Sequence, residues 1–208
     1  MPNPFTELLG DYMLTPETTQ ALSRAALEGI SIVPMLTPVT EKGALDEAAF
    51  RRLVNHILNG GCRGILISAT VGEAVSMSSR MRIRMAEIAA DAHDGRGYLF
   101  FGIGADSQQE SIVLGKAAYR VGVDALFTHL PTYYSITEPE IEEWFVELAN
   151  QIKAPLFLDN APLTTGHSIP LAAVKRLSRH PNIVGIKDVD ANEGRQMRLG
   201  RMFLKRKD

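Results

Sequence analysis

The fold class is decided by residues 155–187, PLFLDNAPLTTGHSIPLAAVKRLSRHPNIVGIK. The two ends of this stretch, Pro155 to Asp159 and Ile183 to Lys187, are short aliphatic runs of the length that buried strands have. The segment between them begins near Pro170 and has the spacing of apolar residues that predicts a helix. Two strands joined by a helix in so short a stretch predict a β/α/β unit with parallel strands.

The same arrangement recurs along most of the chain. Four more aliphatic runs precede this unit: Ile30 to Leu36, Gly64 to Ser68, Tyr98 to Ile103 and Asp124 to His129. Helix start signals stand between the runs, at Asp46 and Ser78 and at the capping-box pairs Ser107 with Glu110 and Thr137 with Glu140. The strand centres repeat about every 26 to 35 residues, the length of one strand, one helix and two loops. The sequence therefore predicts six consecutive β/α units.

Strands that are apolar on both faces predict a parallel sheet covered by helices, which is either an open doubly wound sheet or a closed barrel. Periodicity alone leaves both open. Gly102-Ile103-Gly104 follows a strand as in dinucleotide-binding folds, but Ser107 stands where that fingerprint has its third glycine. The sequence therefore disfavours a dinucleotide-binding domain.

The composition is that of one globular domain, with 208 residues, 45% apolar content and a formal net charge of −2. This balanced charge provides no basic footprint for nucleic acid or an anionic membrane, so a small-molecule partner is expected. The N-terminus lacks the features of a signal peptide, and no apolar run approaches the roughly 20 residues that cross a bilayer. We therefore expect a cytoplasmic protein, and its single cysteine, Cys62, agrees with a reducing compartment.

The chain is expected to divide into two regions. Residues 1–29 stand outside the repeat, and Thr15 with Pro16 is expected to open a helix that closes at Gly29. We interpret them as an N-terminal extension with one accessory helix. Residues 30–208 form the β/α domain.

Lys187 is the first candidate for chemistry. It ends an otherwise apolar strand, and strand alternation predicts that it shares a face with Gly185 and Ile183. If that face lines a barrel, the amine projects inward near the carboxyl end of the strand, where barrel active sites lie. Burial disfavours the charged ammonium, so such a lysine is a usable carbonyl nucleophile. The alternative is a lysine that extends from a strand end into solvent, and spacing alone leaves both open.

Four motifs at strand ends resemble those of one known family. They are Thr70-Val71-Gly72-Glu73, Pro131-Thr132-Tyr133-Tyr134, Asp159-Asn160-Ala161-Pro162 with Thr165-Gly166, and Gly185-Ile186-Lys187-Asp188. With the four motifs in this order, the chain resembles the dihydrodipicolinate synthase and N-acetylneuraminate lyase family from about Gly29 to Asp208. The resemblance implies an α/β (β/α)8 TIM barrel and a class I lyase, an aldolase or dehydratase whose Lys187 forms a Schiff base with pyruvate or another 2-keto acid. It also implies that no cofactor or metal is used, and that the protein is a homo-oligomer, a dimer or a tetramer.

The resemblance assigns roles to five more residues. Thr70 matches a family hydroxyl that takes part in a proton relay, and the amides of Val71 and Gly72 would hold the carboxylate of the keto acid. Val71 stands where the family has a second hydroxyl residue, so the carboxylate site loses a side-chain donor while the backbone donors remain. Tyr133 and Tyr134 match a tyrosine pair near the pocket and the subunit contact, with Tyr134 the expected member of the relay. The alternative for both is aromatic packing under a loop.

Two positions depart from the family pattern. Asp159 stands where the family usually has a tyrosine that shuttles protons to the substrate. An ionised Asp159 would favour protonated lysine, whereas a neutral carboxylic acid could act as a proton donor. Thr164 occupies the place of an arginine that binds the second carboxylate in the dihydrodipicolinate synthases, so this recognition is lost. A sugar acid or another keto acid is therefore the expected substrate.

The five histidines show no paired spacing typical of a zinc site, so no metal is expected. His129 ends the fourth predicted strand and is a candidate substrate contact. The other four are interpreted as surface residues.

Six units fall short of the eight that make a barrel of about 250 residues, so the last two units are missing from this chain. We expect them to belong to a longer natural chain, with supply by another chain or a rearrangement as alternatives. Asp159, Val71 and the missing units also leave a second function open. In that hypothesis the protein is a catalytically degenerate barrel that binds a keto or sugar acid or serves as an assembly subunit.

Overall fold

The computed structural model describes residues 30–203, and the expected accessory helix within residues 1–29 lies outside them. The strands are β1 (Ile32–Pro34), β2 (Gly64–Ile67), β3 (Tyr98–Gly102), β4 (Ala125–Thr128), β5 (Leu156–Asn160) and β6 (Ile183–Asp188). The helices are α2 (Glu47–Asn59), α3 (Ser79–His93), α4 (Gln108–Arg120), α5 (Glu138–Ile152), α6 (Pro162–Thr165), α7 (Leu171–Leu177) and α8 (Glu193–Phe203), with a 3₁₀ turn, η1, at Ala74–Ser76. All six predicted strands are confirmed, and the short elements α6 and η1 were not predicted.

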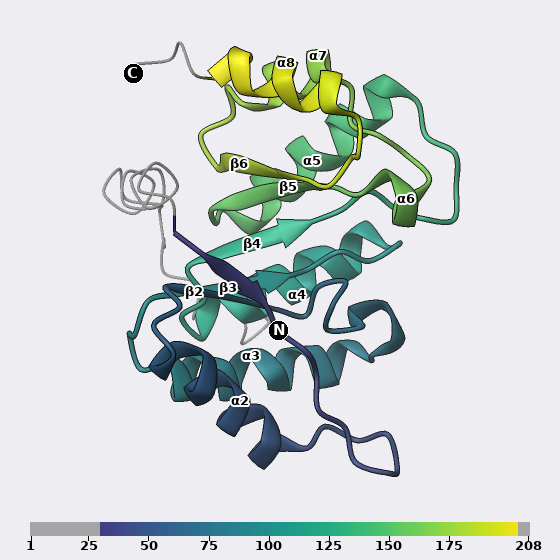
Figure 1. Cartoon of the computed structure of the whole chain (residues 1–208). Coiled ribbons are helices and arrows are strands. Elements are labelled where there is room, and N and C mark those ends of the chain that lie inside the picture. Colours follow the sequence, from purple (N-terminus) through teal and green to yellow (C-terminus); the bar gives the residue numbers. More distant parts are fainter. Residues whose placement is uncertain (1–29, 204–208) are drawn as a thin grey trace.

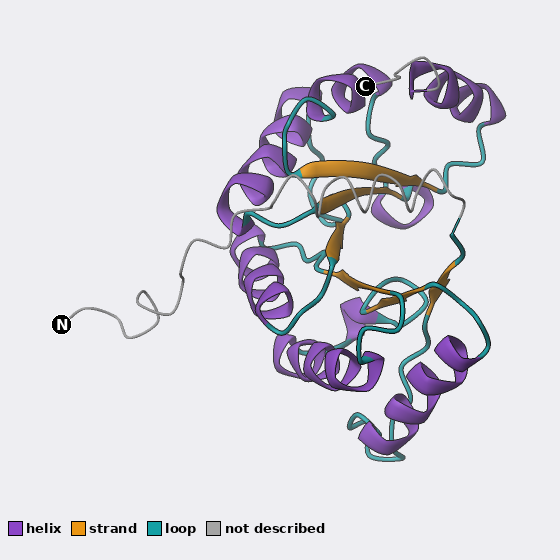
Figure 2. Cartoon of the chain, turned by 90° about the vertical axis from the view of Figure 1, so that its left-hand side faces the viewer, coloured by secondary structure: helices purple, strands orange, loops and turns teal. Residues whose placement is uncertain are grey.

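The six strands form one parallel sheet in chain order, in which each strand pairs with the next (Figure 1). Figure 2 shows the sheet curled into an arc with the long helices outside it. This is the architecture of six units of a TIM barrel, as predicted, and it excludes the doubly wound alternative because strand order never reverses. Strands β1 and β6 form the two edges of the sheet.

Two apolar clusters lie on the two faces of the curled sheet. The larger one packs the outward strand residues, such as Ile65 and Leu126, against the helices. The smaller one lies on the opposite, concave face, where Phe100 and Phe157 both contact Phe127. The rings of Phe127 and Phe157 stack with their centroids 4.6 Å apart. These aromatic side chains fill the interior beneath the carboxyl ends of the strands.

Side-chain caps begin most helices where the sequence predicts them. Asp46, Ser78 and Ser107 each accept a hydrogen bond from the backbone amide three residues later. The capping box of Thr137 with Glu140 is confirmed. In the other predicted capping box, the Ser107 hydroxyl accepts a hydrogen bond from the Glu110 amide. The Glu110 carboxylate instead accepts a hydrogen bond from the hydroxyl of Ser79 on α3.

Strand β6 departs from regular alternation. Ile183 pairs with Leu156 but Gly185 pairs with Phe157, so one residue of β6 has no partner on β5. Ile183 consequently packs in the outer cluster, while Gly185 lies so close to Phe157 that a Cβ atom there would be 2.4 Å from its ring. The prediction that Ile183 shares a face with Lys187 is therefore wrong, and the bulge is the reason.

Candidate active site

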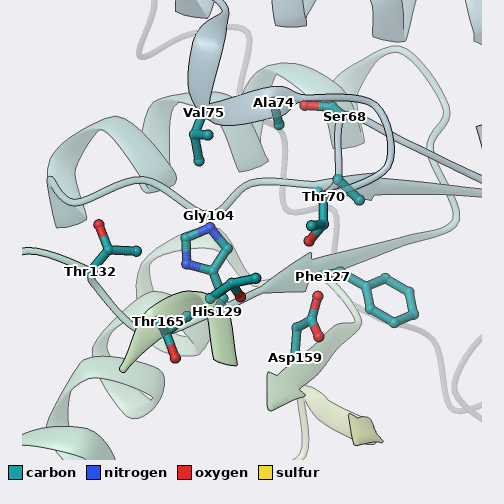
Figure 3. Close-up of a pocket in the computed structure, with 13 residues that line it drawn as sticks. Ser68, Thr70, Ala74, Val75, Gly104, Phe127, His129, Thr132, Asp159 and Thr165 are labelled. Carbon is teal, nitrogen blue, oxygen red and sulfur yellow. The ribbon is translucent and has the colours of Figure 1, made fainter. Parts of the chain in front are cut away.

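A cavity of about 300 Å³ opens at the carboxyl ends of β2 to β5, where parallel barrels place their active sites (Figure 3). Its wall is formed by the loop after β2, by the ends of β3 and β4, and by β5 with α6. The 13 lining residues are Ser68, Ala69, Thr70, Ala74, Val75, Gly102, Gly104, Phe127, His129, Thr132, Asp159, Thr164 and Thr165. Asp159 is the one Asp, Glu, Lys or Arg among them.

Asp159 joins the cavity to Lys187 on the neighbouring strand. The two residues are register partners on β5 and β6, and the Lys187 Nζ atom lies 2.8 Å and 2.9 Å from the two carboxylate oxygens. The Asp159 side chain is 6% exposed and that of Lys187 is 30% exposed. The ion pair therefore stands at the boundary between the interior and the open cavity, with the carboxylate turned into the cavity.

The strand ends that carry this pair are held by a second polar network. The Asn160 side chain donates a hydrogen bond to the Asp188 carboxylate and accepts one from the backbone amide of Ile169. The Asp188 carboxylate also accepts a hydrogen bond of 2.8 Å from Nε of Arg195 on α8, and the side chains of Asp188 and Arg195 are at most 8% exposed. This network ties β5, β6 and α8 together directly beside the Lys187 and Asp159 pair.

Buried Arg82 of α3 organises the opposite wall. Its guanidinium donates to the Ser68 hydroxyl, to the Gly102 carbonyl and to the Gly104 carbonyl at 2.8 to 3.0 Å. All three acceptors belong to lining residues, and Arg82 is 3% exposed. Burial lowers the pKa of Arg82 to about 10, so the side chain stays charged at neutral pH. Ser68 has a φ of 55°, a left-handed conformation that Arg82 helps to hold.

The two glycines that Arg82 binds are required by close packing. A Cβ atom at Gly102 would lie 2.1 Å from the Ser68 carbonyl oxygen, and one at Gly104 would lie 2.2 Å from Nε2 of His129. The Gly102-Ile103-Gly104 segment therefore brings the ends of β2, β3 and β4 close together. It lies in the wall of the cavity.

His129 and Thr132 form the side of the cavity that follows β4. Nδ1 of His129 lies 2.7 Å from the Leu130 carbonyl oxygen. Asp106 accepts hydrogen bonds from the amide and the hydroxyl of Thr132, and these bonds, the amide bond first, hold the Asp106 pKa below its usual range. Positive charge on nearby His129 would lower the pKa of Asp106 further. This contact fixes the start of the loop that continues to Tyr133.

The structure brings five of the nine predicted site residues together. Thr70, His129, Asp159 and Thr164 line the cavity, and Lys187 reaches it through Asp159. The others, Val71, Gly72, Tyr133 and Tyr134, lie outside the lining. Tyr133 and Tyr134 are 79% and 67% exposed and contact each other edge to face. Val71 is also exposed, whereas Gly72 is buried beneath Met35 and Thr37.

Sequence reasoning missed Thr132, Thr165 and Arg82. The two threonines stand within the quoted motifs, so their position beside candidate residues is a signal that could have found them. Arg82 stands among Arg80 and Arg84 on a helix, a pattern that is typical of a solvated face.

Among the described residues, no group of His, Cys, Asp or Glu could hold a metal ion. Within the same part of the chain, no helix has the length and apolar character needed to cross a membrane.

Comparisons with known proteins agree on one family. The sequence profile of the Dihydrodipicolinate synthetase family matches residues 27–201. A curated 4-hydroxy-tetrahydrodipicolinate synthase from Acidiphilium cryptum is 33% identical over 162 residues, which cover 78% of this chain and 56% of the relative. The chain spans between 54% and 58% of the length of the curated relatives compared.

Solved structures show the same relationship. The chloride-inhibited dihydrodipicolinate synthase from Acinetobacter baumannii, complexed with pyruvate, has a TM-score of 0.80 and 31% identity, covering 82% of this chain and 59% of that one. YagE, a prophage protein of the dihydrodipicolinic acid synthase family from E. coli K12 that was also solved with pyruvate, has a TM-score of 0.79 and 27% identity, covering 82% of this chain and 58% of that one.

Proposed function

Because this chain belongs to the dihydrodipicolinate synthetase family, we propose that it is part of a class I lyase that forms a Schiff base between Lys187 and pyruvate or another 2-keto acid. The observation that carries the proposal is the pairing of Lys187 with Asp159 at the cavity. It supplies a nucleophile and a proton acceptor in contact with each other, as covalent catalysis by an amine requires. Two of the solved relatives were crystallised with pyruvate, which supports the choice of keto acid.

Asp159 would serve as the proton carrier in this reaction. It takes a proton from the Lys187 ammonium, and the neutral amine attacks the keto carbon of the substrate. The protonated Asp159 then returns its proton to the developing alkoxide, which gives a carbinolamine protonated on its nitrogen. The Asp159 carboxylate takes one proton from this nitrogen and passes it to the hydroxyl group, which leaves as water. An iminium remains on Lys187, and Asp159 is ionised again. The carboxylate thereby takes the place of the tyrosine that the family usually has at this position.

The substrate carboxylate would be bound at the loop after β2. We propose that the Thr70 hydroxyl and the amides of Val71 and Gly72 contact it, and that Tyr134 joins the proton relay with Tyr133 beside it. Thr164 stands in the cavity where the dihydrodipicolinate synthases have an arginine, so a second carboxylate would lack its partner. A sugar acid or another keto acid with one carboxylate therefore fits better than the substrate of lysine biosynthesis.

The decisive experiment is chemical trapping. Pyruvate and borohydride, added together to the full-length protein, should leave one reduced adduct on the peptide that contains Gly185 to Asp188. Lys187→Ala should abolish the adduct, and Lys187→Arg should do so too because its guanidinium stays charged. Lys175→Ala, which changes an exposed lysine on α7, serves as the matched control and should keep the adduct. An adduct at Lys153 or Lys175, or none in the parent protein, would rule the proposal out.

A further inference from the structure

The cavity wall that follows β4 and β5 presents hydrogen-bond acceptors. The Thr132 hydroxyl must donate to Asp106, because a carboxylate only accepts. The hydroxyls of Thr164 and Thr165 donate to backbone carbonyls, at Ala161 for the first and at Ala161 or His167 for the second. With their protons already engaged, these hydroxyls can offer only lone pairs to a ligand.

His129 adds a fourth acceptor, and its tautomer follows from its contact. Nδ1 lies 2.7 Å from the Leu130 carbonyl, which cannot donate, so Nδ1 carries the proton. In the neutral ring, Nε2 then has a free lone pair. Nε2 lies beside Gly104, another lining residue, in a position that leaves no room for a Cβ atom there. Figure 3 shows the ring inside the cavity, with Asp159 reaching the same space from the next strand.

These acceptors select the chemistry of the ligand. The lining residues include no Lys or Arg, and Lys187, which reaches the cavity through Asp159, would be consumed by the imine. An anionic tail would therefore meet lone pairs and a carboxylate, whereas hydroxyl groups would find acceptors. The wall formed by His129, Thr132, Thr164 and Thr165 fits an uncharged, hydroxylated tail.

Resting on the function proposed above, we infer that His129 is the base that accepts the proton of the 4-hydroxyl group when a 4-hydroxy-2-keto acid is cleaved. The bond between carbons 3 and 4 breaks, and its electron pair moves into the iminium on Lys187 to give an enamine. The hydroxyl on carbon 4 loses its proton to Nε2 of His129 and becomes the carbonyl of an aldehyde. The proton that His129 gained then passes through solvent to carbon 3, which regenerates the iminium. Hydrolysis of the iminium releases pyruvate and restores Lys187 and His129.

The test separates two steps that share the imine. Exchange of the methyl protons of pyruvate in heavy water requires the imine and enamine but no 4-hydroxyl group, so His129 is not needed for it. Cleavage of 4,5,6-trihydroxy-2-ketohexanoate requires both. His129→Asn keeps a donor for the Leu130 carbonyl but has no base at the position of Nε2. In the full-length protein it should retain exchange within about threefold while cleavage falls roughly 10² to 10⁴-fold, the range of general base catalysis.

The matched control is His56→Asn, which changes an exposed histidine on α2 and should leave both rates unchanged. Cleavage by His129→Asn at the parental rate would overturn the inference, and so would an equal loss of exchange and cleavage, which indicates a structural role. A parent protein without a borohydride-trapped adduct would instead refute the proposed function, and the inference with it.

A second arm tests the acceptor wall with three aldehydes in the synthetic direction. With pyruvate as donor, glyceraldehyde should react with a higher kcat/KM than propanal, by roughly threefold to tenfold for each hydroxyl group. Glyceraldehyde 3-phosphate should be the poorest of the three. The variant Thr132→Val should reduce the preference for glyceraldehyde over propanal. A preference for the phosphate, or none among the three, would contradict this assignment of the wall.

Discussion

The Lys187 Nζ atom lies within 2.9 Å of both carboxylate oxygens of Asp159, so the proposed nucleophile contacts the one carboxylate in the cavity lining, and this group can accept its proton. Asp159→Asn should therefore lower turnover of a 2-keto acid roughly 10² to 10⁴-fold, since an amide neither accepts nor returns the proton. The measurement is steady-state kinetics with a panel of keto acids.

Asp159→Glu is the matched control for this prediction, because it keeps the carboxylate and should retain part of the activity. Tight binding of a keto acid by the parent protein with no turnover would favour the alternative hypothesis of a catalytically degenerate barrel. Equal turnover by the parent and by Asp159→Asn would show that the carboxylate carries no proton.

Replacement of Arg82 should destabilise the fold as well as the cavity. Arg82→Met would leave the buried acceptors of Ser68, Gly102 and Gly104 without their donor, at a cost of roughly 2 to 5 kcal/mol in the free energy of unfolding. Denaturant titration measures this change. Arg80→Met, on the exposed face of the same helix, should change stability by less than about 0.5 kcal/mol. Similar values for the two variants would contradict the role given to Arg82.

Stability should decrease in mild acid because of His93, which is 6% exposed, so the prediction that it is a surface residue is wrong. Burial lowers the pKa of His93 below its ordinary value of 6.5, and its Nε2 has no hydrogen-bond partner among the described residues. Below pH 6.5, His93 binds a proton in the unfolded chain but stays neutral in the folded protein. The free energy of unfolding therefore falls as the pH falls towards the pKa of His93 in the folded state. The contribution is at most about 1.4 kcal/mol per pH unit.

Chemical denaturation at pH 7 and pH 5.5 measures this dependence. His93→Leu should reduce the difference between the two pH values, because leucine binds no proton in either state. His56→Leu, at the exposed position on α2, should leave the difference unchanged. If His93→Leu shows the parental dependence, another group is responsible.

The exposed tyrosine pair predicts self-association of the protein. Tyr133 and Tyr134 pack edge to face with their ring centroids 4.9 Å apart, yet each is more than 60% exposed. Exposed aromatic pairs are typical of surfaces that bind other proteins. We expect the full-length protein to sediment as a dimer or tetramer and Tyr133→Ser to shift it towards smaller species. Val113→Ser, at an exposed valine on α4, should have no such effect.

The fold was largely predictable because its signals are local. Apolar runs, capping residues such as Asp46 and a regular repeat each depend on neighbours in the chain, and the structure confirms them. The pairing of Lys187 with Asp159 follows from the register of two adjacent strands once the sheet is known. Arg82 was not predictable, since its burial depends on the carbonyl groups of Gly102 and Gly104, at the end of β3 and just after it, which are distant from Arg82 in the sequence. The extra residue in β6 was missed because strict alternation was assumed for the whole strand.

That extra residue has a consequence for tolerance of deletions. Ile183 faces the helices and Lys187 faces Asp159, although the two are four residues apart, because Val184 has no register partner on β5. In a regular strand, loss of one residue turns over every side chain on one side of the deletion. Here, deletion of Val184 would restore regular alternation, with Gly185 and Lys187 still facing inward. The Lys187 amine would therefore keep its orientation after loss of Val184, whereas loss of one residue from a regular strand would turn such a side chain to the other face of the sheet.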